Sequence, residues 1–400
     1  MSAKFSINDL LSEYSQIRLA TESDNEEILK FCSEINMSTS SMSLRYERSP
    51  DYFAFLKEQT SRYFVFVFLN KDDSIGGVCS VVLKQQYIDG ELCRLAYLCD
   101  LRTSPSLYRL ARVQWRNCYA KVVAGLRDII EFEECKYFYS AVFSDNQIAQ
   151  EALVKRNRHY VYRELGSYHA VSVIFKKFWQ KKETKSDRFV TENISENNEN
   201  ELRLFLNTEM KQQTLGEHIE AEKNEYDELA RRLKGWHNFS LNDFIVVREK
   251  RSRKIVATLA PWLQADARRM VVTNLPRSLS VLSVLARAFG RANLKQDGIL
   301  RVLNLTHFSI DSSLSKEAAR EVILQLFNAV FARASTKNSH VSTLILPRHY
   351  DSLLEVIQSK FVHTITSGKL YQVMSPRDFS EKRNLPDESA APIAFEVGIA

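Results

Sequence analysis

Residues 62–103 read RYFVFVFLNKDDSIGGVCSVVLKQQYIDGELCRLAYLCDLRT, the most strand-like part of the sequence. Three runs rich in β-branched and aromatic residues alternate with two turn sequences, Asp72-Asp73-Ser74 and Asp89-Gly90. Such runs, joined by turns this short, are typical of antiparallel strands that follow one another in a sheet. The stretch therefore predicts a three-stranded meander.

The segments around the meander alternate between the spacing of strands and the spacing of helices. In order, we predict a strand at 16–20, helices at 21–35 and 49–59, the meander, a helix at 110–132, a strand at 136–143, a helix at 145–156 and a strand at 163–175. The order of elements is thus β-α-α-β-β-β-α-β-α-β. This is the pattern of an α/β domain with a mixed, mostly antiparallel sheet.

The second half of the chain repeats this order in outline, with a period near 190 residues. Strands are predicted at 188–194, 243–250, 254–264, 269–275, 298–310, 340–347 and 369–374, and helices at 199–213, 224–236, 279–292, 315–335 and 349–360. The apolar helix at 279–292 has no counterpart in the first half. A lysine-rich, polar break over residues 176–200 separates the halves, so we predict two tandem domains, residues 1–180 and 187–400.

Composition excludes several classes of protein. The 400 residues contain 44% hydrophobic and 26% charged residues, and the net charge is only +6, from 55 Lys and Arg against 49 Asp and Glu. No apolar run approaches the roughly 18 residues of a membrane helix, and the start of the chain does not resemble a secretory signal. All six cysteines precede residue 136 without a CxxC pair. We expect a cytoplasmic protein without a metal site or a membrane partner, and the charge does not favour nucleic acid.

Four segments of the first half, spanning residues 16–175, resemble the GCN5-related N-acetyltransferase superfamily (GNAT) in their order and spacing. They are Ile17 to Ala20 with Asp24, Tyr97 to Thr103 with Pro105, Arg109 to Gln114, and Asn146 with Ala149 and Ala152. The resemblance implies two acetyltransferase-like domains, each with a mixed, mostly antiparallel sheet flanked by helices. It also implies acetyl-CoA as a substrate, bound by the first domain.

The resemblance places the cofactor at the end of the central strand and at the loop and helix that follow. The residues implied are Leu101, Arg102, Thr103, Arg109, Leu110, Ala111, Arg112, Val113, Gln114 and Asn146. A strand-to-helix turn presents free backbone N–H groups to a pyrophosphate, and glycines favour that approach. Here the Arg-x-x-Gly-x-Gly of the family reads RLARVQ. Arginines at 109, 112 and 116 share one helix face and could meet phosphates instead; a solvated basic stripe is the alternative reading.

The catalytic residues of the family are only partly present. A tyrosine that protonates the departing thiolate in the family corresponds to Leu153 here. Tyr160 lies just downstream and is our candidate for the acid, although a tyrosine packed in the sheet would look the same. The resemblance makes Asp100, on the central strand, the candidate base.

Three functions remain open. The first is an N-acetyltransferase that moves an acetyl group from acetyl-CoA to an amine of a small molecule or a protein, with a homodimer as an option. The second is an inactive relative that serves as a CoA sensor or a protein-interaction scaffold, which the missing glycines favour. The third, a nucleic-acid binder using the basic turn at 248–254, is the least favoured because stacking aromatic residues are not interleaved with the charges.

Overall fold

The computed structural model describes residues 4–38, 43–155, 159–177, 186–220, 227–264, 268–295 and 298–396. The predicted domain boundary near residue 181 lies outside these residues. The meander is confirmed as β4 (Tyr63–Leu69), β5 (Ile75–Ile88) and β6 (Glu91–Thr103), with antiparallel pairing throughout. β1 (Ile17–Leu19) pairs with β4, and β7 (Cys135–Phe143) runs parallel to β6.

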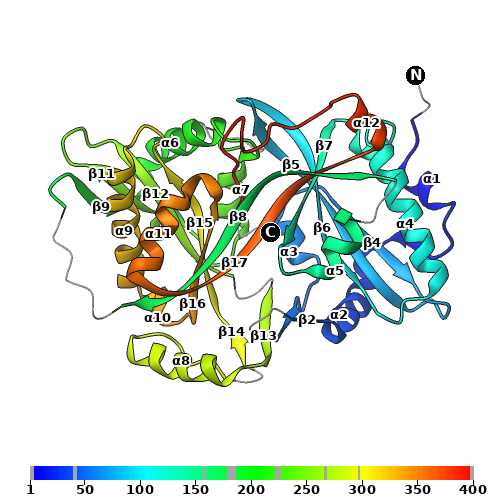
Figure 1. The fold of residues 1–400 in the computed structure, drawn as a ribbon, viewed down its shortest axis with the longest axis horizontal. Coiled ribbons are helices and arrows are strands. Elements are labelled where there is room, and N and C mark those ends of the chain that lie inside the picture. The colour runs from blue at the N-terminus through cyan, green and yellow to red at the C-terminus, as the bar shows by residue number, and fades with distance from the viewer. Residues whose placement is uncertain are drawn as a thin grey trace.

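The two halves are joined into one sheet by an exchange of strands (Figure 1). β17 (Phe361–Met374), from the end of the chain, lies between β7 and β8 (Val161–Lys176) and pairs antiparallel with both. β8 in turn pairs with β16 (Val341–Pro347) of the second half. Beyond β16 the sheet continues through β15 (Val302–Ile310), β12 (Ile255–Leu263), β11 (Ile245–Glu249) and β9 (Phe189–Asn193). The strand order is β1-β4-β5-β6-β7-β17-β8-β16-β15-β12-β11-β9, and β10 (Gly216–Glu217) adds to β5. Each half is therefore completed by a strand of the other.

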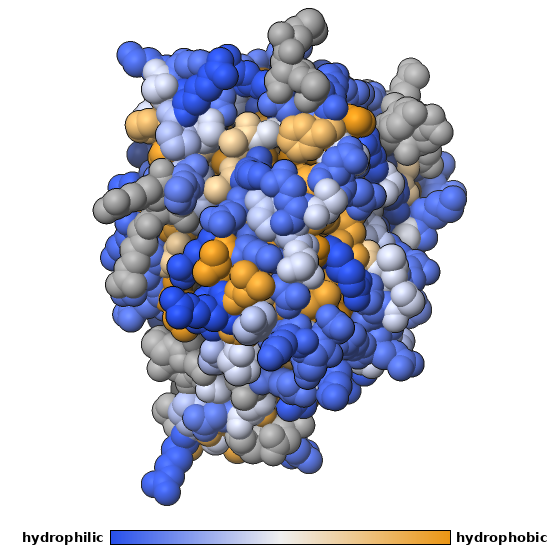
Figure 2. Space-filling model, turned by 90° about the vertical axis from the view of Figure 1, so that its right-hand side faces the viewer, coloured by the Kyte–Doolittle hydropathy of each residue, from blue (hydrophilic) through white to orange (hydrophobic). Residues whose placement is uncertain are grey.

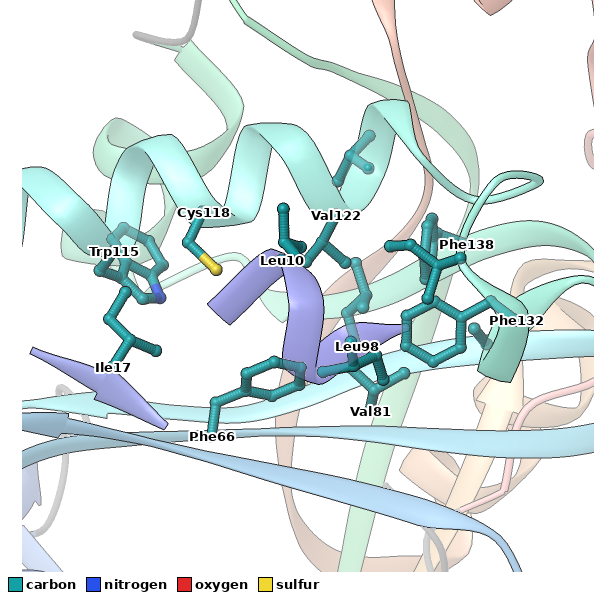
Figure 3. Packing of buried hydrophobic residues seen from close by; sticks show 14 of the residues in the cluster. Leu10, Ile17, Phe66, Val81, Leu98, Trp115, Cys118, Val122, Phe132 and Phe138 are labelled. Carbon is teal, nitrogen blue, oxygen red and sulfur yellow. The ribbon is translucent and has the colours of Figure 1, made fainter. Parts of the chain in front are cut away.

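Helices cover both faces of the first half of the sheet. On one face, α1 (Ile7–Leu11) and α4 (Arg109–Ala124) pack against the strands, and Figure 3 shows Trp115, Cys118 and Val122 of α4 directed at Phe66 and Leu98. The other face is covered by α2 (Asn25–Glu34) and α3 (Ala54–Gln59). Apolar residues alternate between the faces along β4 and β6, so each strand contributes to both cores. The prediction of a mixed, mostly antiparallel sheet flanked by helices is confirmed.

The second half has the same layers. Its strands are β9 (Phe189–Asn193), β11 (Ile245–Glu249), β12 (Ile255–Leu263) and β15 (Val302–Ile310), and its helices are α6 (Glu199–Lys211), α7 (Glu228–Gly235), α9 (Lys316–Ala332), α10 (Ala334–Lys337) and α11 (Asp351–Lys360). The chain ends in α12 (Pro376–Ser380) and a segment that packs back between the halves. No helix in the described part of the chain is long and apolar enough to span a membrane.

Two predicted elements differ from their expected places. β13 (Arg269–Asn274) does not extend the second meander; it joins β14 (Ile299–Leu300), β3 (Ser43–Glu47) and β2 (Asn36–Ser38) in a separate four-stranded sheet. The predicted helix at 145–156 is short, with α5 (Gln147–Ala149) followed by a π-helical turn. α8 (Arg277–Ala288) is confirmed as a helix and lies at the edge of the molecule (Figure 1).

Candidate functional site

A bulge in β6 ends its pairing with β7. The parallel pairing runs from Arg94 opposite Cys135 to Leu98 opposite Ser140, and no later pair forms among the described residues of the two strands. On the β5 side the register shifts, so that β6 carries one extra residue, and Asp100 has a positive φ of 60°. A bulge with a left-handed residue bends a strand and interrupts its ladder. β6 and β7 therefore diverge just beyond Leu98.

The second half contains a bulge of the same kind. β15 pairs with β16 only as far as Asn304 opposite Thr343, and the register of β12 and β15 shifts between Thr258 and Ala260. His307 is the residue with positive φ, 52°. The internal repeat predicted from the sequence thus extends to the bulge, where Asp100 and His307 occupy corresponding places.

Asp100 is enclosed by positive charge. Its Oδ2 lies 2.5 Å from Nη1 of Arg48 and accepts a hydrogen bond of 3.0 Å from the Tyr52 hydroxyl, while Arg102 Nη2 donates to Oδ1 at 3.0 Å. Burial by itself would raise the pKa of Asp100, but the two guanidinium groups lower it to about 2. The carboxylate is held ionised and is a weak base near neutral pH. Burial also raises the pKa of the neighbouring Cys99 thiol to about 12, which keeps it protonated.

Tyr160 lies on the opposite face of the sheet from the Asp100 side chain. It is buried in the cluster beneath α4 and meets Tyr119 edge to face, whereas Tyr52, the partner of Asp100, belongs to the cluster beneath α2 and α3. Burial raises the pKa of the Tyr160 hydroxyl, which has no hydrogen-bond partner among the described residues. The structure does not bring the two candidate catalytic side chains together, and their roles stay predictions.

The loop between β6 and α4 leaves a helix N-terminus open. No side chain caps α4 at Tyr108 within this fully described segment, and the first turn holds no acidic residue. Arg112 donates to the carbonyl oxygens of Pro105 (2.9 Å) and Leu107 (3.4 Å), so it orders the loop, while Arg109 remains exposed. Free N–H groups and the positive end of the helix dipole at such an N-terminus favour the binding of an anion.

Apolar side chains are exposed beside this helix N-terminus. Leu101 at the end of β6, and Leu110 and Val113 on α4, are all exposed. Figure 2 shows hydrophobic surface among polar residues on the side of the molecule that carries α4 and β4. Asn146, also predicted to contact the cofactor, caps α5 by accepting from Ala149 N–H at 3.1 Å. Ala149 packs against the hydrophobic cluster beneath α4, to which Ala111 also belongs.

The corresponding loop of the second half is closed to anions. Ser315 caps α9 by accepting from Ala318 N–H, and Glu209 Oε2 accepts from Ser312 N–H at 3.1 Å. Glu317 adds a further negative charge in the first turn. Carboxylates here would repel a phosphate, and the binding of the cofactor by the first half stays a prediction.

A cavity of about 40 Å³ lies where the two halves meet. It is lined by Lys84 and Gln86 of β5, Tyr139 of β7, Glu217 of β10, residues of β15 and β16, and Phe395 and Glu396 near the end of the chain. This cavity was not predicted from the sequence, because its lining comes from separate segments of both halves that share no local spacing. The carboxylates of Glu217 and Glu396 and the amine of Lys84 are the charged groups in this lining, and most of the other lining residues are apolar.

Buried charges surround the Glu217 side of the cavity. Arg232, fully buried, lies 2.5 Å from Glu217, 2.9 Å from Glu396 and 3.2 Å from Glu228. Burial raises the pKa of Glu217 to about 7, against the lowering effect of Arg232, and burial lowers the pKa of Lys84 to about 8. Both groups can exchange a proton near neutral pH, which is what acid–base catalysis requires.

His307 packs into the same cluster as a neutral side chain. Arg232 Nη1 donates to its Nε2 at 3.0 Å, and its Nδ1 is 2.9 Å from Thr306 Oγ1. Burial, helped by Arg232, lowers the pKa of His307 to about 3. Among the residues that the structure describes, no three His, Cys, Asp or Glu side chains are grouped as metal ligands.

No family model matches the sequence, and no curated protein matches it. Among solved structures, N-myristoyltransferase of Saccharomyces cerevisiae with bound myristoyl-CoA has a TM-score of 0.58 and 9% identity, covering 99% of this chain and 89% of that chain. A second structure of that enzyme has a TM-score of 0.56 and 10% identity, covering 93% and 87%.

A GCN5-related glucosamine N-acetyltransferase region in a fungal multi-domain β-N-acetylglucosaminidase has a TM-score of 0.55 and 10% identity, covering 89% of this chain and 38% of that chain. At such low identity these similarities concern the fold. They confirm that the chain has the fold of the GCN5-related N-acetyltransferases, in an arrangement similar to that of N-myristoyltransferase.

Proposed function

We propose that the protein is an N-acyltransferase that moves an acetyl group from acetyl-CoA to an acceptor whose amino group enters the junction cavity. The observation that carries the proposal is the divergence of β6 and β7 at the Asp100 bulge, directly followed in the chain by the open N-terminus of α4. Free backbone groups and an uncapped helix N-terminus in one strand-loop-helix segment support a site for a phosphate-bearing donor there. The neighbouring structure named above is described with bound myristoyl-CoA, which supports a CoA thioester as donor.

The donor would lie along this segment. Its pyrophosphate would meet the first N–H groups of α4 and the exposed Arg109, in place of the glycine loop of the family. The apolar parts of the cofactor would cover Leu101, Leu110 and Val113, which otherwise face water.

The reaction needs three things from the chain. Backbone N–H groups released where β6 and β7 diverge would polarise the thioester carbonyl. As the amine attacks, a C–N bond forms and the C–S bond breaks, and the amine loses a proton; Glu217, which lines the cavity with a raised pKa, is the carboxylate that we assign to take it. A thiol is acidic enough to leave as a thiolate, as the cysteine pKa of about 8.5 illustrates, so departure of CoA does not require the tyrosine that Leu153 replaces.

The packing favours a short acyl group. The core beneath α4 is filled by aromatic residues. The Trp115 ring contacts the rings of Phe68 and Tyr119, and Phe138 belongs to the same hydrophobic cluster. The cavities at the junction and beneath β17 measure about 40 and 10 Å³, which is room for one or two water molecules. We therefore propose acetyl, and not a long acyl chain, as the transferred group.

Calorimetric titration with acetyl-CoA, CoA and myristoyl-CoA tests the donor site. We expect micromolar binding of acetyl-CoA, a loss of at least tenfold in Arg109→Glu, and unchanged binding in Arg251→Glu, a matched exposed arginine in the turn between β11 and β12. Release of CoA thiol is then measured with a panel of amines. No binding at millimolar ligand would refute the proposal, and binding without turnover of any amine would favour the CoA sensor.

A further inference from the structure

The helix α8 packs on the molecule with only one of its faces. Ser283 and Ala286 are buried, and Ala286 joins a small cluster with Ile174 and Phe175 of β8. Ser283 Oγ accepts from Leu294 N–H at 2.7 Å and so ties the helix to the segment that follows it. α8 is therefore anchored, and its orientation is set by contacts on its inner side.

The outer face of α8 is an apolar stripe. Val281, Val284 and Leu285 are 62%, 64% and 50% exposed, and Ala288 continues the series at the surface. Positions i, i+3, i+4 and i+7 lie in one line along a helix, so these side chains form one continuous stripe. Single exposed aliphatic residues are common in proteins, but a contiguous stripe on a helix at the edge of the molecule marks an interaction surface.

The segment that carries α8 also holds the net charge of the protein. Residues 268–301, which include β13, α8 and β14, contain seven Lys and Arg, of which Arg291 is buried, and one Asp, a net charge of +6. The whole chain also has a net charge of +6, so the rest of the chain contains equal numbers of basic and acidic residues, 48 of each. Arg277 and Arg287, near the two ends of α8, are exposed. The net positive charge of the chain is thus concentrated in residues 268–301.

We propose that α8 docks on an anionic lipid surface. Val281, Val284 and Leu285 would enter the boundary between headgroups and acyl chains, and Arg277 and Arg287 would face the headgroup phosphates. An apolar helix face flanked by basic residues is suited to such a surface.

A second copy of the chain fits this face less well. A two-fold dimer through α8 would bring two segments of charge +6 together, which opposes association. An anionic bilayer instead complements the charge, and it accepts a convex stripe without a matching groove. The inference does not depend on the proposed enzymatic activity, and it departs from the composition-based expectation of no membrane partner.

Co-sedimentation with vesicles tests the proposal on the full chain. The vesicles consist of phosphatidylcholine alone or of phosphatidylcholine with one third phosphatidylserine. We expect binding to the anionic vesicles only, weakened by added salt. Replacing both Arg277 and Arg287 by alanine should lower the affinity by roughly thirtyfold, since each basic residue near such a surface contributes a factor of about five. The triple variant Val281→Ser, Val284→Ser, Leu285→Ser should not bind.

Two controls keep the result interpretable. Leu204→Ser, at an exposed leucine of α6, and Arg251→Glu should bind like the unchanged protein, and circular dichroism confirms that every variant is folded. Absence of binding to anionic vesicles overturns the proposal, as does binding that survives both α8 variants. Light scattering that shows a dimer abolished by the triple variant, without vesicle binding, would assign the stripe to a second copy and also overturn it.

Discussion

Replacing Asp100 by asparagine should unfold the protein more readily rather than slow a single chemical step. Asparagine tolerates a positive φ, so the bulge can keep its backbone. The substitution removes the negative charge shared by Arg48 and Arg102, whose side chains are 3% and 8% exposed. Leaving buried cations without their partner costs about 3–5 kcal/mol.

Protonation of the same carboxylate provides a second measure. The pKa of Asp100 is lowered from 3.8 to about 2, so its charge stabilises the fold above pH 4, and this contribution is lost as the pH falls toward 2. Nearly two pKa units correspond to about 2 kcal/mol. We therefore expect the substitution to lower the free energy of unfolding by about 2 to 5 kcal/mol.

Urea unfolding at pH 7, followed by tryptophan fluorescence, measures this loss. The matched control is Asp145→Asn, an exposed aspartate just after β7, which should change the free energy of unfolding by less than about 0.5 kcal/mol. If Asp100→Asn is as stable as the unchanged protein, yet abolishes CoA-dependent turnover, the structural reasoning is wrong and Asp100 is the base predicted from the sequence.

Three further predictions concern the junction and the exchanged strand. His307 is neutral when folded, with its pKa lowered from 6.5 to about 3, so stability should fall as the pH drops below 6.5, and urea midpoints for His307→Gln should lose that slope. Glu217, with its pKa raised from 4.5 to about 7, has the opposite effect, because the free energy of unfolding falls as the pH rises through this range. Glu217→Gln should remove that fall. If Glu217 is the base, the variant should also lose the part of the pH–rate profile that reports a pKa of about 7. Gly368→Ala would place a Cβ 2.3 Å from the Tyr168 ring, so it should cost about 1–3 kcal/mol in urea unfolding, while Gly235→Ala, whose Cβ meets nothing within 4 Å, should not. Equal stability of the two glycine variants would contradict the packing of β17 against β8.

The meander and its neighbours were predictable because their signals are local. The turns at Asp72 and Asp89 and the alternating runs between them specify antiparallel strands without reference to the rest of the chain. The strand-loop-helix segment from Leu101 to Gln114 was identified by its resemblance to the GCN5-related N-acetyltransferases, and the structure shows an open helix N-terminus there. The loss of the family glycines and of its tyrosine could also be read directly from the residues.

The junction cavity was not predictable from spacing. Lys84, Glu217 and Glu396 are brought together only by the pairing of β10 with β5 and by the return of the chain end between the halves. The shifted pKa values of Lys84 and Glu217 arise from burial, which a sequence does not display. The same holds for Asp100, whose negative charge is balanced by Arg48, 52 residues earlier in the chain.

The residue pattern therefore specifies the order of the longer elements, and it predicts an internal repeat and a segment that would face a cofactor. The insertion of β17 between β7 and β8 follows from the tertiary structure alone. Strand periodicity specifies that a segment pairs and which side chains share a face, but it does not name the partner. The partner is chosen by long-range packing, here against Tyr168 and the two cores that β17 joins.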